Sequence, residues 1–395
     1  MDNTGLPIPV IMYHTVGRVM EDWKWSFLTV PAETFADHLK WLSKYDYRTV
    51  DIDELCAHVS GAQPLPRRSV FLTFDDGYVD NWTYVAPLLE RYGFKGTVFV
   101  NPDFVDPRDI VRPTLHDVWN SKIAESELEI RGFMSWPELR HLAEHGPLSV
   151  QSHAMTHTWY PTSAKIVDFH HPDDGYYWLD WNAFPEKKPF YMLDPLKTDI
   201  PYGMPIYEHE KALAATRYYP NPEEGDALAD FVRQKSGPEF FASSGWREQL
   251  LGKVEDLRKG GLKAGHSESS DEKMERYRFE LIRAREILEE RLGKKADFLC
   301  WPGGGYNEVS QTVALEIYSA VTLSSRDVSA IRNRMGDNPK LIKRCGVPGI
   351  VRKGEVFYPG GRYLVRFLEE YQGSKFARRR RQLLKLIGMA QRWVT

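Results

Sequence analysis

The chain has 395 residues, enough for one large domain with an insertion or for two modest domains. Its apolar and charged fractions, 42% and 27%, are ordinary for a globular protein and exclude a largely disordered chain. A net charge of −3 gives no support to nucleic acid as a partner. The three cysteines, Cys56, Cys300 and Cys345, are too few and too scattered for a disulfide framework or a zinc knuckle.

The first residues, MDNTGLPIPVIMYHTVG, lack the basic region, apolar run and small-residue cleavage site of a signal peptide. No apolar stretch reaches the roughly 18 residues that a membrane span needs. We therefore expect a cytoplasmic protein.

Five short apolar runs, read as buried strands, each end in a polar or special residue. These runs are 8–13 before His14, 69–74 before Asp75, 96–100 before Asn101, 147–152 before His153, and 296–301 before Pro302. Helical patterns with apolar residues three and four apart lie between them, at Phe35, Leu39 and Leu42, at Val85, Leu88 and Leu89, at Leu139 and Leu142, and along 272–292. This alternation predicts an α/β fold with a parallel sheet, open or closed into a barrel, and reactive side chains at the carboxyl ends of the strands.

Residues 159–266 break this rhythm with aromatic residues and turn formers, so we expect an insertion that caps the main domain, with helices near 225–235 and 246–258. The barrel itself would comprise 1–158 and 267–360. Residues 361–395 are expected to form a basic amphipathic helix, with Phe376, Leu383, Leu384, Ile387, Ala390 and Val394 near one face. Such a helix suits an anionic membrane surface, and it equally suits docking on its own protein with the arginines outward.

Two pairs of residues carry the candidate chemistry. In TFDDGY (73–78), one of two adjacent carboxylates could bind a metal while the other takes a proton from water, although Asp pairs are also common in turns. In SHAMTH (152–157), His153 and His157 lie on one face if the segment forms a helical turn. Two imidazoles and one carboxylate are a usual zinc set with room for water and substrate, so together the motifs favour a metal site.

These motifs, with FKGTVFV, MSWPELRHLAEHG, ELIRAREILEERLGKKADF and LCWPGGGYNE, resemble the polysaccharide deacetylase family with the NodB homology domain. The resemblance covers roughly residues 7–158 and 267–350, and it implies a distorted parallel (β/α) barrel. It further implies that Asp75 is the catalytic base and that Asp76, His153 and His157 hold a divalent metal, expected to be Zn²⁺. The tetrahedral oxyanion would rest on the metal and on a backbone N–H, for which we expect that of Tyr78.

The chain departs from the family pattern at three places. The late stretch LIKRCGVPG (341–349) has no His, so His14 in IMYHTV is the expected general acid, as in the circularly arranged branch that includes poly-N-acetylglucosamine deacetylases. The alternative for His14 is a hydrogen-bonded core histidine. Cys300 stands where the family often has an Arg that orients the base. For the Asp that often accompanies the acid, only Arg326-Asp327 offers a candidate.

The expected substrate is a carbohydrate. We expect contacts from Tyr78, Trp301, Pro302, Gly304 and Trp178, with the insertion's rings Tyr176, Tyr177, Trp178 and Trp181 offered to sugar faces. His170, His171, Asp173 and Asp174 (HHPDD) are read as a solvated turn.

The sequence thus predicts an N-deacylase, and the expected acyl group is acetyl, on an amino sugar of a bacterial surface glycan or its lipid-linked precursor. The alternatives are an inactive carbohydrate-binding relative, to which Cys300 points, and an O-deacetylase, because the same metal and base serve esters and amides alike.

Overall fold

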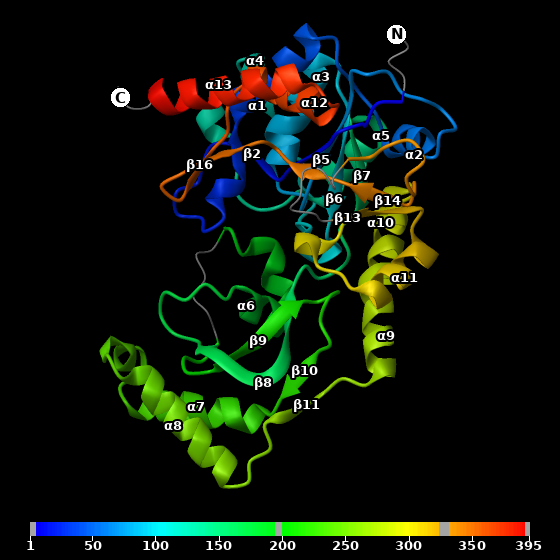
Figure 1. The fold of residues 1–395 in the computed structure, drawn as a ribbon. Coiled ribbons are helices and arrows are strands. Elements are labelled where there is room, and N and C mark those ends of the chain that lie inside the picture. Colours follow the sequence, from blue (N-terminus) through cyan, green and yellow to red (C-terminus); the bar gives the residue numbers. More distant parts are fainter. Residues whose placement is uncertain (1–4, 194–199, 324–331, 392–395) are drawn as a thin grey trace.

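The computed structural model describes residues 5–193, 200–323 and 332–391. Its central feature is a nine-stranded sheet in which every pair of neighbours runs parallel (Figure 1). The strands are β1 (Val10–Tyr13), β4 (Arg48–Thr49), β5 (Ser69–Phe74), β6 (Gly96–Val100), β7 (Leu148–Ser152), β12 (Phe298–Leu299), β13 (Ala320–Leu323), β14 (Leu341–Lys343) and β15 (Cys345–Gly346). All five predicted strands are among them.

The segment 341–346 closes this sheet. The strand order is β14-β13-β12-β7-β6-β5-β1-β15, with β4 beside β5, so β14 and β15 stand at opposite ends. Yet they follow each other in the chain, separated only by Arg344. Leu341 pairs with Val321 of β13, and Cys345 pairs with Ile11 of β1. The two ends of the sheet therefore meet at Arg344, and the predicted distorted parallel barrel is confirmed.

Helices surround the barrel, and those predicted at 35–42, 85–89, 139–142 and 272–292 are among them. They are α1 (Ala32–Lys44), α2 (Ile52–Val59), α3 (Ala86–Tyr92), α4 (Leu115–Trp119), α5 (Trp136–His145), α9 (Ser270–Arg278), α10 (Ala284–Leu292), α11 (Glu308–Ile317) and α12 (Gly361–Tyr371). Several begin at a side chain that accepts a hydrogen bond from the backbone N–H three residues on, worth about 1 kcal/mol each. These caps are Asp51, Ser135, Ser269 and Asn307. The predicted helix 272–292 is α9 and α10 joined by a π-helical turn, Phe279–Arg283.

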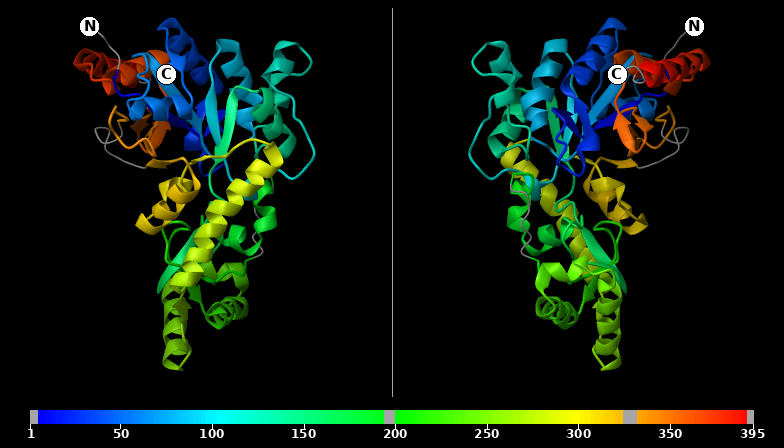
Figure 2. Two further views of the ribbon diagram at one scale, coloured as in Figure 1. Left: turned by 90° about the vertical axis from the view of Figure 1, so that its right-hand side faces the viewer. Right: turned by 90° about the vertical axis from the view of Figure 1, so that its left-hand side faces the viewer.

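The insertion lies across the carboxyl ends of the barrel strands, as the two views of Figure 2 also show. Its elements are β8 (Trp159–Phe169), α6 (Trp178–Ala183), β9 (Pro205–Lys211), β10 (Tyr218–Pro220), α7 (Pro222–Gln234), α8 (Trp246–Lys259) and β11 (Gly265–Ser267). β8 pairs antiparallel with β9, and β10 with β11. The expected helices near 225–235 and 246–258 are α7 and α8, and they share a small apolar core of their own with β8.

The C-terminal segment differs from the single helix expected over 361–395. It forms two helices, α12 and α13 (Lys375–Gln391), because Gly373 takes the left-handed φ of +100° between them. α12 buries its apolar face, including Leu364 and Leu368, in the barrel's main core. Among the described residues, no helix is both long and apolar enough to cross a membrane.

Two small pairings complete the described fold. β2 (Thr15–Gly17) runs parallel to β3 (Thr29–Pro31). β16 (Ile350–Arg352) and β17 (Glu355–Phe357) form an antiparallel hairpin.

Candidate metal and catalytic site

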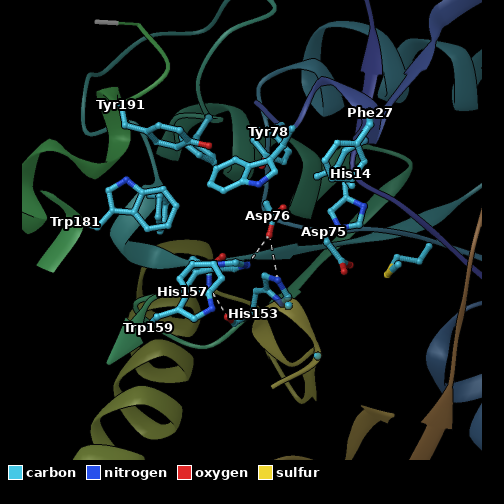
Figure 3. Close-up of a pocket in the computed structure, with 18 of the residues that line it drawn as sticks. His14, Phe27, Asp75, Asp76, Tyr78, His153, His157, Trp159, Trp181 and Tyr191 are labelled. Atoms are coloured by element: carbon cyan, nitrogen blue, oxygen red, sulfur yellow. Dashed lines mark hydrogen bonds and ion pairs between the residues drawn. The ribbon is translucent and has the colours of Figure 1, made fainter. Parts of the chain in front are cut away.

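A cavity of about 370 Å³ lies where the insertion covers the carboxyl ends of the strands (Figure 3). One wall is polar and consists of residues that follow barrel strands, and the other is aromatic. The polar residues are His14, Asp75, Asp76, Asn101, His153, His157 and Arg344, and the rings are Trp25, Phe27, Tyr78, Phe104, Phe133, Trp159, Trp181 and Tyr191.

The three expected metal ligands converge in this cavity. Asp76 Oδ1 lies 3.1 Å from His153 Nε2 and 3.3 Å from His157 Nε2. The centroids of the two imidazole rings are 5.3 Å apart. Figure 3 shows both rings turned toward the Asp76 carboxylate. Residues up to 81 positions apart in the chain (Asp76 and His157) are thus brought to one point at the mouth of the barrel.

The donor set at this point fits a cation. His153 Nδ1 lies 2.8 Å from the backbone carbonyl oxygen of Cys300, which can only accept. Nδ1 therefore carries a proton, and in the neutral imidazole Nε2 presents its lone pair. Asp76 Oδ1 is buried and receives no hydrogen bond in the described structure. Lone pairs that face one another in a buried place repel unless a cation lies between them. Two imidazoles and a carboxylate are a usual ligand set for Zn²⁺.

The His-x3-His segment isn't a helical turn, which corrects the sequence interpretation. Residues 153–157 form a loop, in which Ala154 and His157 take left-handed φ values of +57° and +43°. Asp76 also has a left-handed φ, +73°. Such conformations cost on the order of 1–3 kcal/mol each and persist where the surroundings enforce them. The imidazoles therefore meet through loop geometry and not through helical spacing.

Three buried side chains hold this loop in place. Glu280, in the π-helical turn, accepts hydrogen bonds from the N–H groups of Met155 (3.3 Å) and Thr156 (3.0 Å). Asn101, at the end of β6, donates to the carbonyl oxygens of His153 and Ala154. A third support comes from the insertion, whose Lys188 donates to the Thr156 carbonyl over 3.0 Å.

Asp75, the expected base, is held by Arg344. The guanidinium forms two parallel bonds with the carboxylate, Nη1 to Oδ1 at 2.6 Å and Nη2 to Oδ2 at 2.9 Å. Arg344 Nη2 also lies 2.8 Å from the Sγ of Cys300. Burial alone would raise the pKa of Asp75, but the charge of Arg344 outweighs burial and lowers it below its usual value. Asp75 is therefore ionised at neutral pH, as a base must be.

Sequence reasoning missed Arg344. Cys300 leaves the base without its usual orienting Arg, and the stretch LIKRCGVPG (341–349) stood out in the sequence only because it has no His. The one available signal was the Arg in that same stretch. Its approach to Asp75 depends on the pairing of β15 with β1 and of β1 with β5, which no local pattern reveals.

His14, the expected acid, follows β1 and lines the cavity. In Figure 3 its ring lies beside Asp75 and below Phe27. The segment after β5 fixes it, because Asn81 Nδ2 donates to the His14 carbonyl at 3.0 Å and Asp80 Oδ2 accepts from the Val16 N–H at 3.1 Å. Its position is that of a cavity residue, and its role as acid stays a prediction.

The expected substrate contacts divide into two groups. Tyr78 and Gly304 line the cavity, as does Trp181. Trp301, Pro302 and Trp178 aren't among the lining residues. Trp301 is fully buried and stacks on Tyr306 at 5.1 Å, Pro302 is buried beside it, and Trp178 lies in the aromatic core. These three are placed as core residues, so the arrangement gives no support to their predicted contact with substrate.

HHPDD is also not the solvated turn that the sequence suggested. His170 is only 5% exposed, and its Nδ1 lies 2.6 Å from Asp174 Oδ2. Asp174 also accepts the N–H of His171, so the segment folds back on itself, and only Asp173 is exposed. Arg326-Asp327 lies outside the described residues.

Comparison with known proteins relates the chain to polysaccharide deacetylases. The polysaccharide deacetylase family model matches residues 62–168. Over 150 residues, 38% of this chain, the sequence is 27% identical to YxkH of Bacillus subtilis (strain 168), which is named as a polysaccharide deacetylase. It is also 27% identical over 149 residues to the poly-beta-1,6-N-acetyl-D-glucosamine N-deacetylase of Escherichia coli (strain K12). The matches span 43% and 20% of those two proteins.

A solved structure shares the fold. The de-N-acetylase from Aggregatibacter actinomycetemcomitans superposes with a TM-score of 0.51 at 16% identity, over 85% of this chain and 93% of that one. At that identity the likeness concerns the fold alone. In its family-model match over residues 62–168, its motifs and its fold, the chain is similar to the polysaccharide deacetylases.

Proposed function

We propose that this chain is a metal-dependent hydrolase that removes an N-acyl group, acetyl in the first instance, from an amino sugar of a bacterial surface glycan or its lipid-linked precursor. One observation carries the proposal: Asp76, His153 and His157 converge beside an Asp75 that Arg344 keeps ionised. The named activity of the Escherichia coli relative supports the choice of an N-acetylated sugar.

Each protein group has a definite part in the hydrolysis. A bound Zn²⁺ would polarise the amide carbonyl and make water more acidic. The Asp75 carboxylate takes a proton from the attacking water while the water oxygen bonds to the carbonyl carbon. The C–N bond then breaks, and His14 gives a proton to the departing nitrogen, because an amide anion is too basic to leave. The products are a carboxylic acid and a free amine.

The backbone N–H of Tyr78 is suited to stabilise the oxyanion. Tyr78 faces Phe133 in an antiparallel bridge whose two hydrogen bonds use neighbouring groups: Met134 N–H donates to Gly77 (3.0 Å), and Val79 N–H donates to Gly132 (2.9 Å). The bridge therefore leaves the N–H of Tyr78 itself for another acceptor. Since Tyr78 comes two residues after Asp76, this donor lies next to the ligand cluster.

The aromatic wall supports a sugar as the substrate. Trp25, Trp159, Trp181 and Tyr191 present flat, largely apolar surfaces opposite the polar wall. Sugar rings have apolar C–H faces that stack on such side chains while their hydroxyls bond elsewhere. The inactive-relative hypothesis rested on Cys300, and the contact between Arg344 and Asp75 removes that ground.

Metal content and acetate release test the proposal. Purified protein should hold about one divalent ion per chain, and it should release acetate from N-acetylated oligosaccharides. Asp75→Asn should retain the ion and lose turnover, which separates catalysis from metal binding. A metal-loaded, folded wild type that releases no acyl group from any N-acetylated or O-acetylated glycan would refute the proposal. The cytoplasmic location expected from the sequence stays a proposal of its own.

A further inference from the structure

Helix α13 is attached to the rest of the molecule along one side only. Ala377 on this helix is 1% exposed, and Arg381, one turn further, forms bonds with Glu370 Oε2 (2.6 Å) and the Tyr363 hydroxyl (2.9 Å) of α12. Residues four apart lie on the same face of a helix. Ala377 and Arg381 therefore mark the face of α13 that docks on α12.

The side of α13 turned away from α12 carries three exposed apolar side chains. Phe376 is 63% exposed, Leu383 57% and Leu386 64%. Phe376 and Leu383 are seven residues apart, so they lie on one line along the helix, and they point away from the docked face. Three large apolar side chains so exposed on a single helix form a stripe that the described part of the chain does not cover.

Cations lie within and beside this stripe. From Lys375 to Gln391 the helix contains Lys and Arg residues but no Asp or Glu. Arg378 and Arg381 face Glu370 of α12. Arg379 and Arg380 are exposed and lie on either side of Phe376 by helical position, and the Arg380 guanidinium is 4.3 Å from the Phe376 ring centre. The whole chain has a net charge of −3, so this positive charge is a local feature.

The combination selects among possible partners. A nucleic acid would use the cations but would leave Phe376 and Leu383 in water. A second copy of the chain would cover the apolar stripe but would bring Arg379 and Arg380 of the two copies together. An anionic lipid surface satisfies both features, since the apolar stripe enters the headgroup region while the arginines meet lipid phosphates.

We propose that α13 docks the protein on an anionic membrane surface through Phe376, Leu383 and Leu386, with Arg379 and Arg380 bonded to lipid headgroups. This docking is peripheral, because the helix lies along the surface. It goes beyond the proposed hydrolase activity and does not depend on it. α13 is at the top of Figure 1 and the insertion at the bottom, so the docking surface is remote from α7 and α8.

Vesicle co-sedimentation of the full chain tests the proposal. Vesicles of phosphatidylcholine with phosphatidylglycerol should bind wild type at least about tenfold more strongly than phosphatidylcholine alone. Arg379→Glu with Arg380→Glu, and separately Phe376→Ser with Leu383→Ser, should each weaken binding about tenfold or more. Lys235→Glu with Lys263→Glu changes the charge equally on exposed residues of the insertion, and it should leave binding within about twofold.

The other outcomes would overturn the proposal. The first is equal binding of wild type to both vesicle types, and the second is a loss of vesicle binding in the Lys235→Glu, Lys263→Glu control as large as in the α13 variants. The third is a loss of vesicle binding in the arginine variant but not in the Phe376→Ser, Leu383→Ser variant, together with binding of duplex DNA by wild type. A dimer in light scattering that the Phe376→Ser and Leu383→Ser variant abolishes, without vesicle binding by wild type, would assign the stripe to self-association. Unchanged acetate release from a soluble oligosaccharide in every variant would show that the site and the fold are intact, so failure here is distinct from failure of the hydrolase proposal.

Discussion

The polar wall of the cavity comes from side chains that follow barrel strands, whereas much of the aromatic wall comes from the insertion and the segment before β3. In the polar wall, directional bonds fix each group: Arg344 holds Asp75, and the Cys300 carbonyl fixes the tautomer of His153. In the aromatic wall, rings contact rings, as when Trp181 lies 5.1 Å from both Phe104 and Tyr191. In the proposed function, the polar wall would carry out the reaction, and the aromatic wall would hold the substrate through contact area.

The most severe way to break the polar wall is to remove the two imidazoles. His153→Ala with His157→Ala leaves only Asp76 of the three ligands, so the metal should be lost and acetate release should fall to background. Metal analysis of the purified variant by mass spectrometry checks this. Retention of about one tightly bound ion per chain would contradict the ligand assignment.

Removing the base alone should spare the metal. Asp75→Asn keeps the size of the side chain but cannot accept the water proton, so kcat should fall about 10²–10⁴-fold. To check this, kcat and the metal content per chain are measured in the same preparation of Asp75→Asn. Near-normal kcat would show that another group takes the proton.

Arg344 offers a test through pH. In Arg344→Gln the cation is gone while Asp75 stays buried, so the pKa of Asp75 should rise. Because the base acts only when ionised, the acid limb of the kcat/KM profile should move to higher pH, and activity near pH 5 should be lost first. In Arg344→Lys, which retains a positive charge, the acid limb should lie between its positions in Arg344→Gln and in wild type. An unmoved acid limb with lowered thermal stability would reduce Arg344 to a structural residue.

The aromatic wall should respond more mildly. Trp181→Ala removes a lining ring that bonds to no reacting group, so KM for a glycan should rise about tenfold with kcat changed less. Leu251→Ala, on the exposed side of α8, is a matched change in the insertion away from the cavity. If Trp181→Ala lowered kcat as strongly as Asp75→Asn, the division between the two walls would be wrong.

Much of the polar wall could be predicted because its information is local. A strand ends, a carboxylate or imidazole follows, and parallel strands bring those ends to one edge. The expectation of a helical turn at 153–157 was wrong because it considered only local spacing. Glu280 and Asn101, which are distant in sequence, bind the backbone groups of this segment and hold it as a loop.

The aromatic wall was harder to predict, since ring type does not distinguish a lining residue from a core residue. Trp178 and Trp181 belong to the same short helix, yet only Trp181 lines the cavity. No pattern in the sequence marks Trp159, the first residue of the insertion, or Trp25 as a lining residue. These differences depend on how the insertion sits on the barrel, which local periodicity does not encode.

The barrel seam has a consequence for assembly of the enzyme during folding. Arg344, the residue between β14 and β15, is also the counterion of Asp75, the proposed proton acceptor. That carboxylate therefore gains its cation only when the two ends of the sheet lie together. A molecule that stops short of joining them carries a buried carboxylate with no cation beside it, which favours protonation or exposure of that group. Formation of the Arg344–Asp75 pair is thereby tied to closure of the barrel.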